Sequence, residues 1–122
     1  MQTKVKTNAE IAAMRESGRM LATVLAALKP KVVAGVSTKQ LAEEAAKELE
    51  SLGGIPSFKG YQSFPDVICI SVNDEVVHGI PSTEKIIKDG DIVGLDFGVT
   101  YKGMITDSAI SVIAGKPKQK GH

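Results

Sequence analysis

The chain has 122 residues, 43% of them hydrophobic and 24% charged, which suffices for one modest core and argues against two domains. Its 15 lysines and arginines balance 14 aspartates and glutamates, so no field of one sign favours nucleic acid or an anionic membrane as a partner. One cysteine excludes an internal disulfide, and the sequence shows neither a signal-peptide pattern nor an apolar run of about 20 residues, so we expect a cytoplasmic protein.

Two amphipathic helices are predicted at the start of the chain. A capping box at residues 7–10 opens the first, which should run from about residue 8 to residue 28 and be closed by Pro30. A second capping box at residues 37–40 opens the next helix, which should end at Gly53 because glycine takes the left-handed cap at little cost. The predicted buried stripes are Ile11, Met14, Gly18, Leu21, Leu25 and Leu28 in the first helix, and Leu41, Ala45, Leu49 and Leu52 in the second.

From Gly54 onward the pattern is extended. The β-branched residues 67–72 predict a strand, and residues 76–78 a short second one. After a turn at 88–91, residues 92–100 read as a strand and 103–113 as its return. Two helices followed by hairpin-connected strands predict an α+β fold, with the two helices packed on an antiparallel β-sheet.

Two carboxylates, Asp96 and Asp107, interrupt the apolar sequence of this last hairpin. A bend centred between Tyr101 and Lys102 would set them directly opposite each other, with Cβ atoms roughly 4.5–5.5 Å apart, where like charges repel. Protonation of one acid, a bridging divalent cation, or solvation at a wet surface would each relieve the repulsion. Because carboxylates on apolar strands are costly unless paired or metal-bound, the metal-site and surface interpretations both stay open.

His78 lies between an apolar stretch and the turn Gly79-Ile-Pro81. A lone histidine in such a place is commonly a hydrogen-bonded structural group. It could equally bind a metal or donate a hydrogen bond to a developing oxyanion. Periodicity does not choose between these roles.

Several short motifs resemble, in order and spacing, the N-terminal half of type I methionine aminopeptidases, which have the pita-bread fold. These motifs are Phe64-Pro65, Cys69-Ile-Ser-Val-Asn73, Val77-His-Gly-Ile-Pro81, Asp89-Gly-Asp91, Leu95-Asp96 and Thr106-Asp-Ser108. The resemblance implies a hydrolase that removes the initiator methionine from new proteins by means of a two-metal site.

The resemblance also implies roles for individual residues. Asp96 and Asp107 would be metal ligands for up to two divalent ions (Co²⁺, Mn²⁺, Fe²⁺ or Zn²⁺), with Asp96 holding both ions. His78 would hydrogen-bond the substrate near the scissile amide without ligating metal. The pocket for the methionine side chain would be lined by Phe58, Tyr61, Phe64 and Cys69, since sulfur and aromatic surfaces pack well on a thioether.

The family's catalytic domain is about twice this long, and its second half brings a histidine ligand, a further histidine and two glutamates. We therefore expect a half-domain over residues 1–117, with 118–122 as a disordered or added tail. It would act on N-terminal methionine together with a complementary half or as a homodimer, in which a symmetric pair would bring four aspartates together. The alternative is a catalytically silent half-domain that self-associates or binds a peptide or a partner chain.

Overall fold

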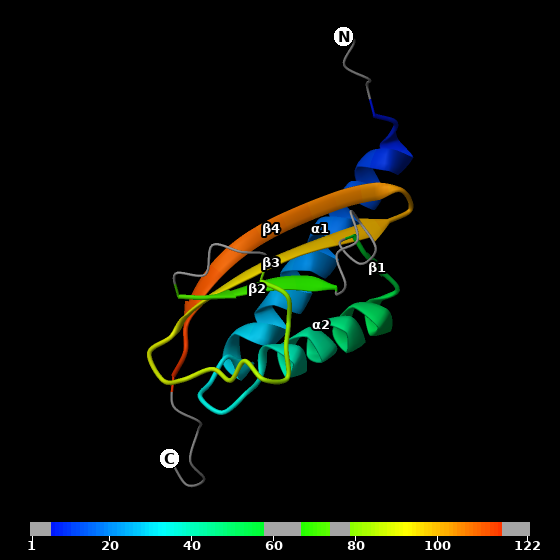
Figure 1. Cartoon of the computed structure of the whole chain (residues 1–122). Helices are drawn as coiled ribbons and strands as arrows, with labels where there is room; N and C mark the ends of the chain where they lie inside the picture. Colours follow the sequence, from blue (N-terminus) through cyan, green and yellow to red (C-terminus); the bar gives the residue numbers. More distant parts are fainter. Residues whose placement is uncertain (1–5, 58–66, 74–78, 116–122) are drawn as a thin grey trace, which may run out of the picture.

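The computed structural model describes residues 6–57, 67–73 and 79–115, and shows two helices laid on one face of a small sheet (Figure 1). Its elements in chain order are α1 (Asn8–Leu28), the 3-10 helix η1 (Lys29–Lys31), α2 (Thr38–Leu52), β1 (Ile55–Pro56), β2 (Ile68–Val72), β3 (Ile92–Tyr101) and β4 (Met104–Ile113). The predicted α+β class is confirmed, and the predicted strand at 76–78 lies outside the described residues.

The sheet is antiparallel throughout and is built around β3. One edge of β3 pairs with β4 over its whole length. The opposite edge pairs first with β2, from Val93 to Phe97, and then with β1, at Val99 and Thr100. All three other strands therefore pair with β3.

Both helices begin where their capping boxes predict. The Thr7 hydroxyl accepts a hydrogen bond from the Glu10 amide at 3.1 Å, and the Ser37 hydroxyl accepts one from the Gln40 amide at 3.1 Å. Gly53 ends α2 in the left-handed conformation, with φ +83°. As predicted, α1 ends at Leu28, before Pro30, and Pro30 lies in the first turn of η1, a position that proline fits well.

The predicted buried stripe of α1 is wrong in part. Ile11 is 38% exposed, while the buried residues are Ala13, Ser17, Met20, Leu21, Val24, Leu25 and Leu28. The prediction followed the large apolar side chains and therefore included Ile11. In the structure the small side chains of Ala13 and Ser17 are buried instead, and their size lets the helix pack close to the sheet. In α2 the stripe is confirmed except at Leu52, which is 37% exposed at the last residue of the helix.

The core lies between the helices and the sheet. Val93, Leu95, Phe97 and Val99 of β3 are fully buried beneath the helices. One buried polar group joins the two layers: the Ser17 hydroxyl donates to the Val99 carbonyl at 3.0 Å and lies 2.8 Å from the Thr106 hydroxyl. This hydroxyl therefore contacts both strands of the β3–β4 hairpin.

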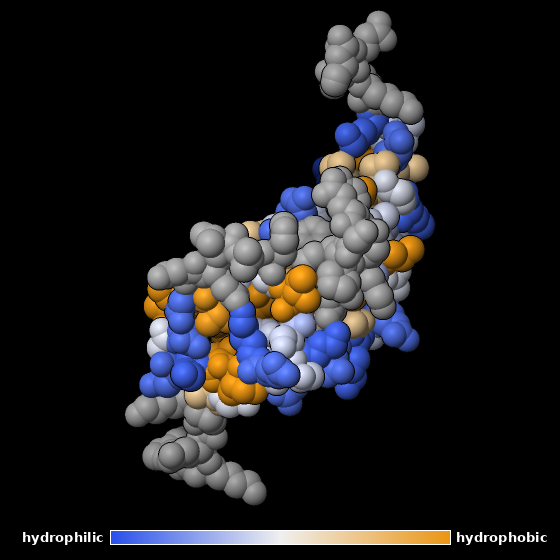
Figure 2. Space-filling view, viewed as in Figure 1, coloured by the Kyte–Doolittle hydropathy of each residue, from blue (hydrophilic) through white to orange (hydrophobic). Residues whose placement is uncertain are grey.

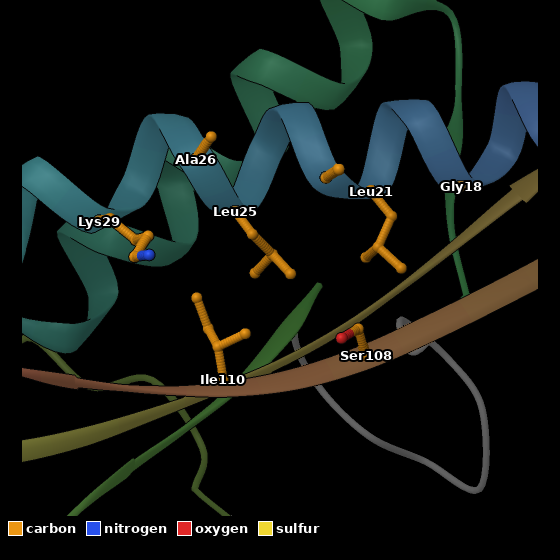
Figure 3. A pocket seen from close by; sticks show the side chains of 8 residues that line it. Gly18, Leu21, Leu25, Ala26, Lys29, Ser108 and Ile110 are labelled. Atoms are coloured by element: carbon orange, nitrogen blue, oxygen red, sulfur yellow. The ribbon is translucent and has the colours of Figure 1, made fainter.

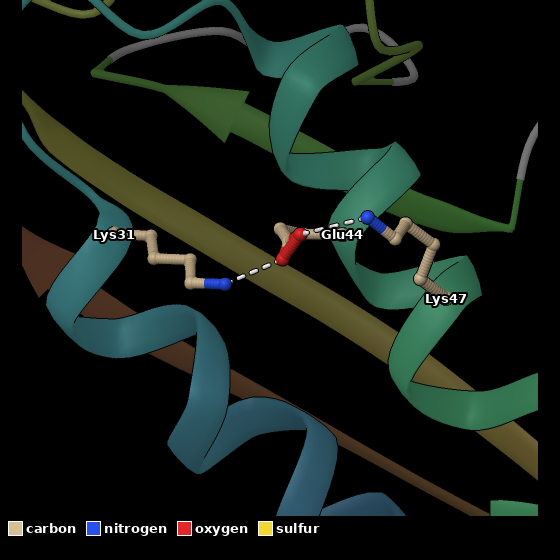
Figure 4. A network of polar contacts seen from close by, with 3 residues as sticks. All are labelled: Lys31, Glu44 and Lys47. Carbon is tan, nitrogen blue, oxygen red and sulfur yellow. Dashed lines mark hydrogen bonds and ion pairs between the residues drawn. The ribbon is translucent and has the colours of Figure 1, made fainter. Parts of the chain in front are cut away.

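A charged cluster ties the end of α1 to α2 (Figure 4). Lys31 of η1 pairs with Glu44 of α2, and Lys47 lies 3.9 Å from the same carboxylate. The hydrogen bond from Lys31, followed by its charge, lowers the pKa of Glu44. The pair is solvent-exposed, so we expect it to contribute little to stability. Within the described part of the chain, neither helix has the length and apolar character needed to cross a membrane.

Candidate functional site

The turn of the β3–β4 hairpin sets the positions of Asp96 and Asp107. Tyr101 pairs with Met104, which leaves Lys102 and Gly103 as a two-residue loop. Both have positive φ, +49° and +81°, as the type I′ turn that matches strand twist requires. The predicted bend between Tyr101 and Lys102 is therefore displaced by one residue, because glycine takes the second left-handed position.

This displacement changes how the two acids meet. Asp96 is directly opposite Ala109, and Asp107 is directly opposite Gly98, so the predicted direct opposition of the acids is wrong. Asp96 and Asp107 are therefore diagonal neighbours. The Cα atoms of such diagonal pairs are roughly 7–8 Å apart. Since residues two apart on a strand share a face, Asp96 and Asp107 still project from the same side of the sheet.

That side is the one facing away from the helices. Along β3, the odd-numbered residues from Val93 to Val99 are buried beneath the helices, whereas Asp96 is exposed. Along β4, Asp107 is exposed as well. We call this helix-free side the open face. It also carries Ile55, Ile92, Ile105 and Ile113, each more than half exposed.

Short residues border Asp96 on the open face. Gly94 and Gly98 lie two residues away from it on β3, and Ala109 is directly opposite it on β4. On the other side, Cys69 of β2 is directly opposite Asp96. Cys69 is partly buried. Asp96 therefore has short side chains beside it on both neighbouring strands.

Electrostatics disfavours two charged carboxylates here. Partial burial, and after it the charge of Asp107, raises the pKa of Asp96. At neutral pH the ionised pair therefore destabilises the folded chain, and either a proton or a cation would relieve the cost. Both aspartates are exposed, as the surface interpretation predicts. Exposure alone does not remove the repulsion between them.

The other predicted site residues, His78, Phe58, Tyr61 and Phe64, lie outside the described residues. The residue after His78 is described and is tightly placed. The Gly79 carbonyl accepts a hydrogen bond from the Ile70 amide at 2.7 Å, and a Cβ at Gly79 would come within 2.2 Å of the Ile70 carbonyl oxygen. The sequence indicated only a turn at Gly79; its close contact with β2 had no sequence signal.

The model of metallopeptidase family M24 matches residues 12–122. The chain belongs to metallopeptidase family M24. It is 45% identical to the methionine aminopeptidase of Aquifex aeolicus over 95% of this chain and 47% of that protein. It is 46% identical to methionine aminopeptidase 1 of Bacillus subtilis over 85% of this chain and 42% of that protein.

Solved structures of related proteins share the fold of this chain. The crystal structure of methionine aminopeptidase from Thermotoga maritima covers 98% of this chain with a TM-score of 0.89 and 35% identity, and 48% of that chain is matched. Prolidase from Pyrococcus furiosus, at 22% identity and a TM-score of 0.77, shares the fold. The chain thus has the pita-bread fold of its M24 relatives, and it spans about half of their length.

Membership of a metallopeptidase family implies the use of divalent metal ions, and the open face can be tested for such a site. Asp96 and Asp107 supply the oxygen donors and the negative charge that hard or borderline divalent ions prefer. Among the described residues, no group of three or more histidines, cysteines, aspartates and glutamates could hold a metal. The acid pair therefore fits part of a metal site, which would need further donors besides these two carboxylates.

Proposed function

We propose that this chain carries half of a metal-dependent aminopeptidase site that removes N-terminal methionine from peptides. The observation that carries the proposal is the placement of Asp96 and Asp107 as diagonal neighbours on one face of the β3–β4 hairpin. Partial burial, and after it the charge of Asp107, raises the pKa of Asp96, and a bound cation would relieve this cost of ionisation. The methionine aminopeptidases at 45% and 46% identity support the choice of substrate.

In this proposal Asp96 and Asp107 hold up to two divalent ions, Co²⁺, Mn²⁺, Fe²⁺ or Zn²⁺. Such ions, when bound, activate a water molecule and polarise the scissile carbonyl. His78 donates a hydrogen bond to the substrate near the scissile amide. The methionine side chain packs against Cys69, which stands beside Asp96, together with Phe58, Tyr61 and Phe64. We place the activity in the cytoplasm, where a free Cys69 stays reduced.

Two carboxylates alone are fewer than the three or more protein ligands typical of catalytic sites. We propose that a second polypeptide supplies the remaining donors, either a complementary half or a second copy of this chain. The alternative function, a half-domain that binds a peptide or a partner chain without catalysis, is favoured by the same shortage of donors among the described residues.

The first test measures release of methionine from the peptide Met-Ala-Ser by the purified chain with Mn²⁺ or Co²⁺. We expect metal-dependent release that Asp96→Asn abolishes and Asp89→Asn does not. Asp89 is the matched control because it is an exposed aspartate in the turn before β3. Metal binding by titration without any release would support the non-catalytic alternative.

Thermal unfolding gives a second readout that does not depend on catalysis. Asp96→Asn should raise the melting temperature of the metal-free chain, because it removes the repulsion with Asp107, and should cancel the rise caused by Mn²⁺. Asp89→Asn should keep that rise. If Mn²⁺ stabilises Asp96→Asn as much as the unaltered chain, the acid pair does not bind the metal.

A further inference from the structure

The outer edge of β4 is a long row of free backbone groups. All ten residues of β4 pair with β3, and within the described ranges no strand pairs with the other edge (Figure 1). The Ile92 and Gly98 carbonyls accept bonds from Asn73 and Ser57, on the side away from β4. By alternation, the even-numbered residues of β4 point their amides and carbonyls at β3, and the odd-numbered ones point them outward.

This edge lacks the usual protection against pairing. Natural edge strands are guarded by lysine, proline, bulges or short length, whereas β4 is ten residues long, contains no lysine or proline, and has Asp107 as its single charge. On the open face of the same strand, Ile105 is 60% exposed and Ile113 is 72% exposed. Figure 2 shows a separate hydrophobic surface, over the region where Figure 1 draws β2 and the segment that leads into β3.

The helix side of the same edge is hollowed. A groove of about 420 Å³ runs between α1 and β4, and Figure 3 shows Leu21 and Leu25 directed toward Ile110 across it. On α1 its wall is lowered by the exposed, short side chains of Ala22 and Ala26. A strand added to β4 would therefore find apolar surface on both faces as well as free backbone groups.

We propose that a second copy of this chain adds its own β4 to this edge, antiparallel and about a two-fold axis beside Ala109. In that register Ala109 opposes Ala109 of the second copy, Asp107 opposes Ser111, and Ile105 opposes Ile113. The two exposed isoleucines cover each other, and each carboxylate faces a hydroxyl donor instead of a second carboxylate. A two-fold axis makes every such contact twice.

Other registers lose this match. A shift of two residues sets Asp107 against Ala109 and Ile105 against Ser111, which leaves the isoleucines uncovered. A shift of one residue would bring side chains of opposite faces together. Self-complementarity of charge and apolar surface is thus the reason for choosing a second copy as the occupant of this edge.

In this pairing the second copy of the chain is the polypeptide that supplies the remaining donors of the proposed metal site. This part of the inference rests on the proposed function. Both open faces become one continuous face, on which Asp96 and Asp107 of each copy flank the two Ala109 residues. The association itself needs no metal, so it can be tested without one.

Sedimentation velocity over a concentration series, with a chelator present, tests the association. We expect a monomer–dimer equilibrium in the unaltered chain. Ser111→Pro removes an outward amide, and Ser111→Asp sets a second carboxylate directly against Asp107; each should raise the dimer dissociation constant about tenfold or more, because the change acts twice across the axis. Ser51→Lys, an exposed change on α2, should leave it unchanged, and circular dichroism checks that every variant is folded.

A cysteine pair tests the register. In a Cys69→Ser background, Ala109→Cys should form a disulfide-linked dimer readily on mild oxidation, since Cα atoms of directly opposed residues lie within the range a disulfide spans. Ser51→Cys is the control. A strict monomer at all concentrations, or equal rates of cross-linking at positions 109 and 51, would overturn the proposal. Methionine release and Mn²⁺ binding are measured separately, so their failure would overturn the proposed function and leave this pairing standing.

Discussion

Asn73 shows how one residue can fix the start of a strand. It adopts a left-handed conformation, with φ +56°, and its side chain bonds the beginning of β3 twice. The amide nitrogen donates to the Asp91 carboxylate at 3.0 Å, and the amide oxygen accepts from the Ile92 backbone at 2.9 Å. The other carboxylate oxygen of Asp91 accepts from the Lys88 amide at 2.8 Å. The position of Asp96 along β3 depends on this anchored beginning.

These bonds predict a pH dependence. The hydrogen bond from Asn73, and then that from the Lys88 backbone, lowers the pKa of Asp91. A carboxyl whose pKa is lowered by folding stabilises the folded state above its unfolded pKa, and this contribution is lost as the pH falls through the folded pKa. Asp91→Ala should therefore lose stability at neutral pH and converge on the unaltered chain in acid. Urea midpoints measured from pH 7 down to the acid range check this; a constant difference at all pH values would contradict it.

The ends of the helices were predicted correctly where residues close in sequence determine them. Capping boxes predicted where both helices begin, and Gly53 predicted where α2 ends, since those signals act within a few residues. Two short elements had no sequence signal: η1, a three-residue 3-10 helix around Pro30, and β1, whose two residues are held by pairing with distant Val99 and Thr100. Such pairing depends on tertiary context, which periodicity does not record.

The hairpin shows the same limit at the candidate site. The sequence predicted that Asp96 and Asp107 share a hairpin and a face, because that follows from spacing. Their register depended on which two residues occupy the turn, and the positive φ of Lys102 and Gly103 decided it. An error of one residue in the turn changed direct opposition into diagonal contact while leaving the face unchanged.

The cap of α2 can be measured. Ser37→Ala removes the hydroxyl that accepts from the Gln40 amide, and such substitutions cost about 1 kcal/mol of unfolding free energy. Ser51→Ala, on the exposed last turn of the same helix, should change stability by less than about 0.5 kcal/mol. Chemical denaturation compares the two; equal losses would show that the cap does not hold the helix start.

At the scale of the whole molecule, one core carries the helices and the open face together. Phe97 is fully buried and stands next to Asp96 in β3. Because adjacent residues of a strand project to opposite faces, Phe97 points into the hydrophobic core and Asp96 points to the open face. The same strand therefore connects the core to the candidate site. The helices and strands that form this core are predictable from the sequence, but the rotation of α1 that buries Ala13 and Ser17 depends on packing against the sheet.

Phe97→Ala should therefore destabilise the entire chain. Truncation of a buried phenylalanine costs about 3–5 kcal/mol, a large share of the roughly 5–15 kcal/mol typical of a domain. Ile55→Ala, at a side chain 63% exposed, is the control and should change little. Equilibrium unfolding measures both, and a loss below about 1 kcal/mol for Phe97→Ala would mean that the strand is not central to the core.

The buried hydroxyl of Ser17 has a consequence for motion. It bonds the Val99 carbonyl and the Thr106 hydroxyl at once, and sliding α1 by one residue, about 1.5 Å, would strand it without a partner. This side chain thereby couples the helix to the hairpin. A shift of the two carboxylates upon ligand binding should then also move α1, so a probe on the outer surface of that helix would report events on the opposite side of the sheet.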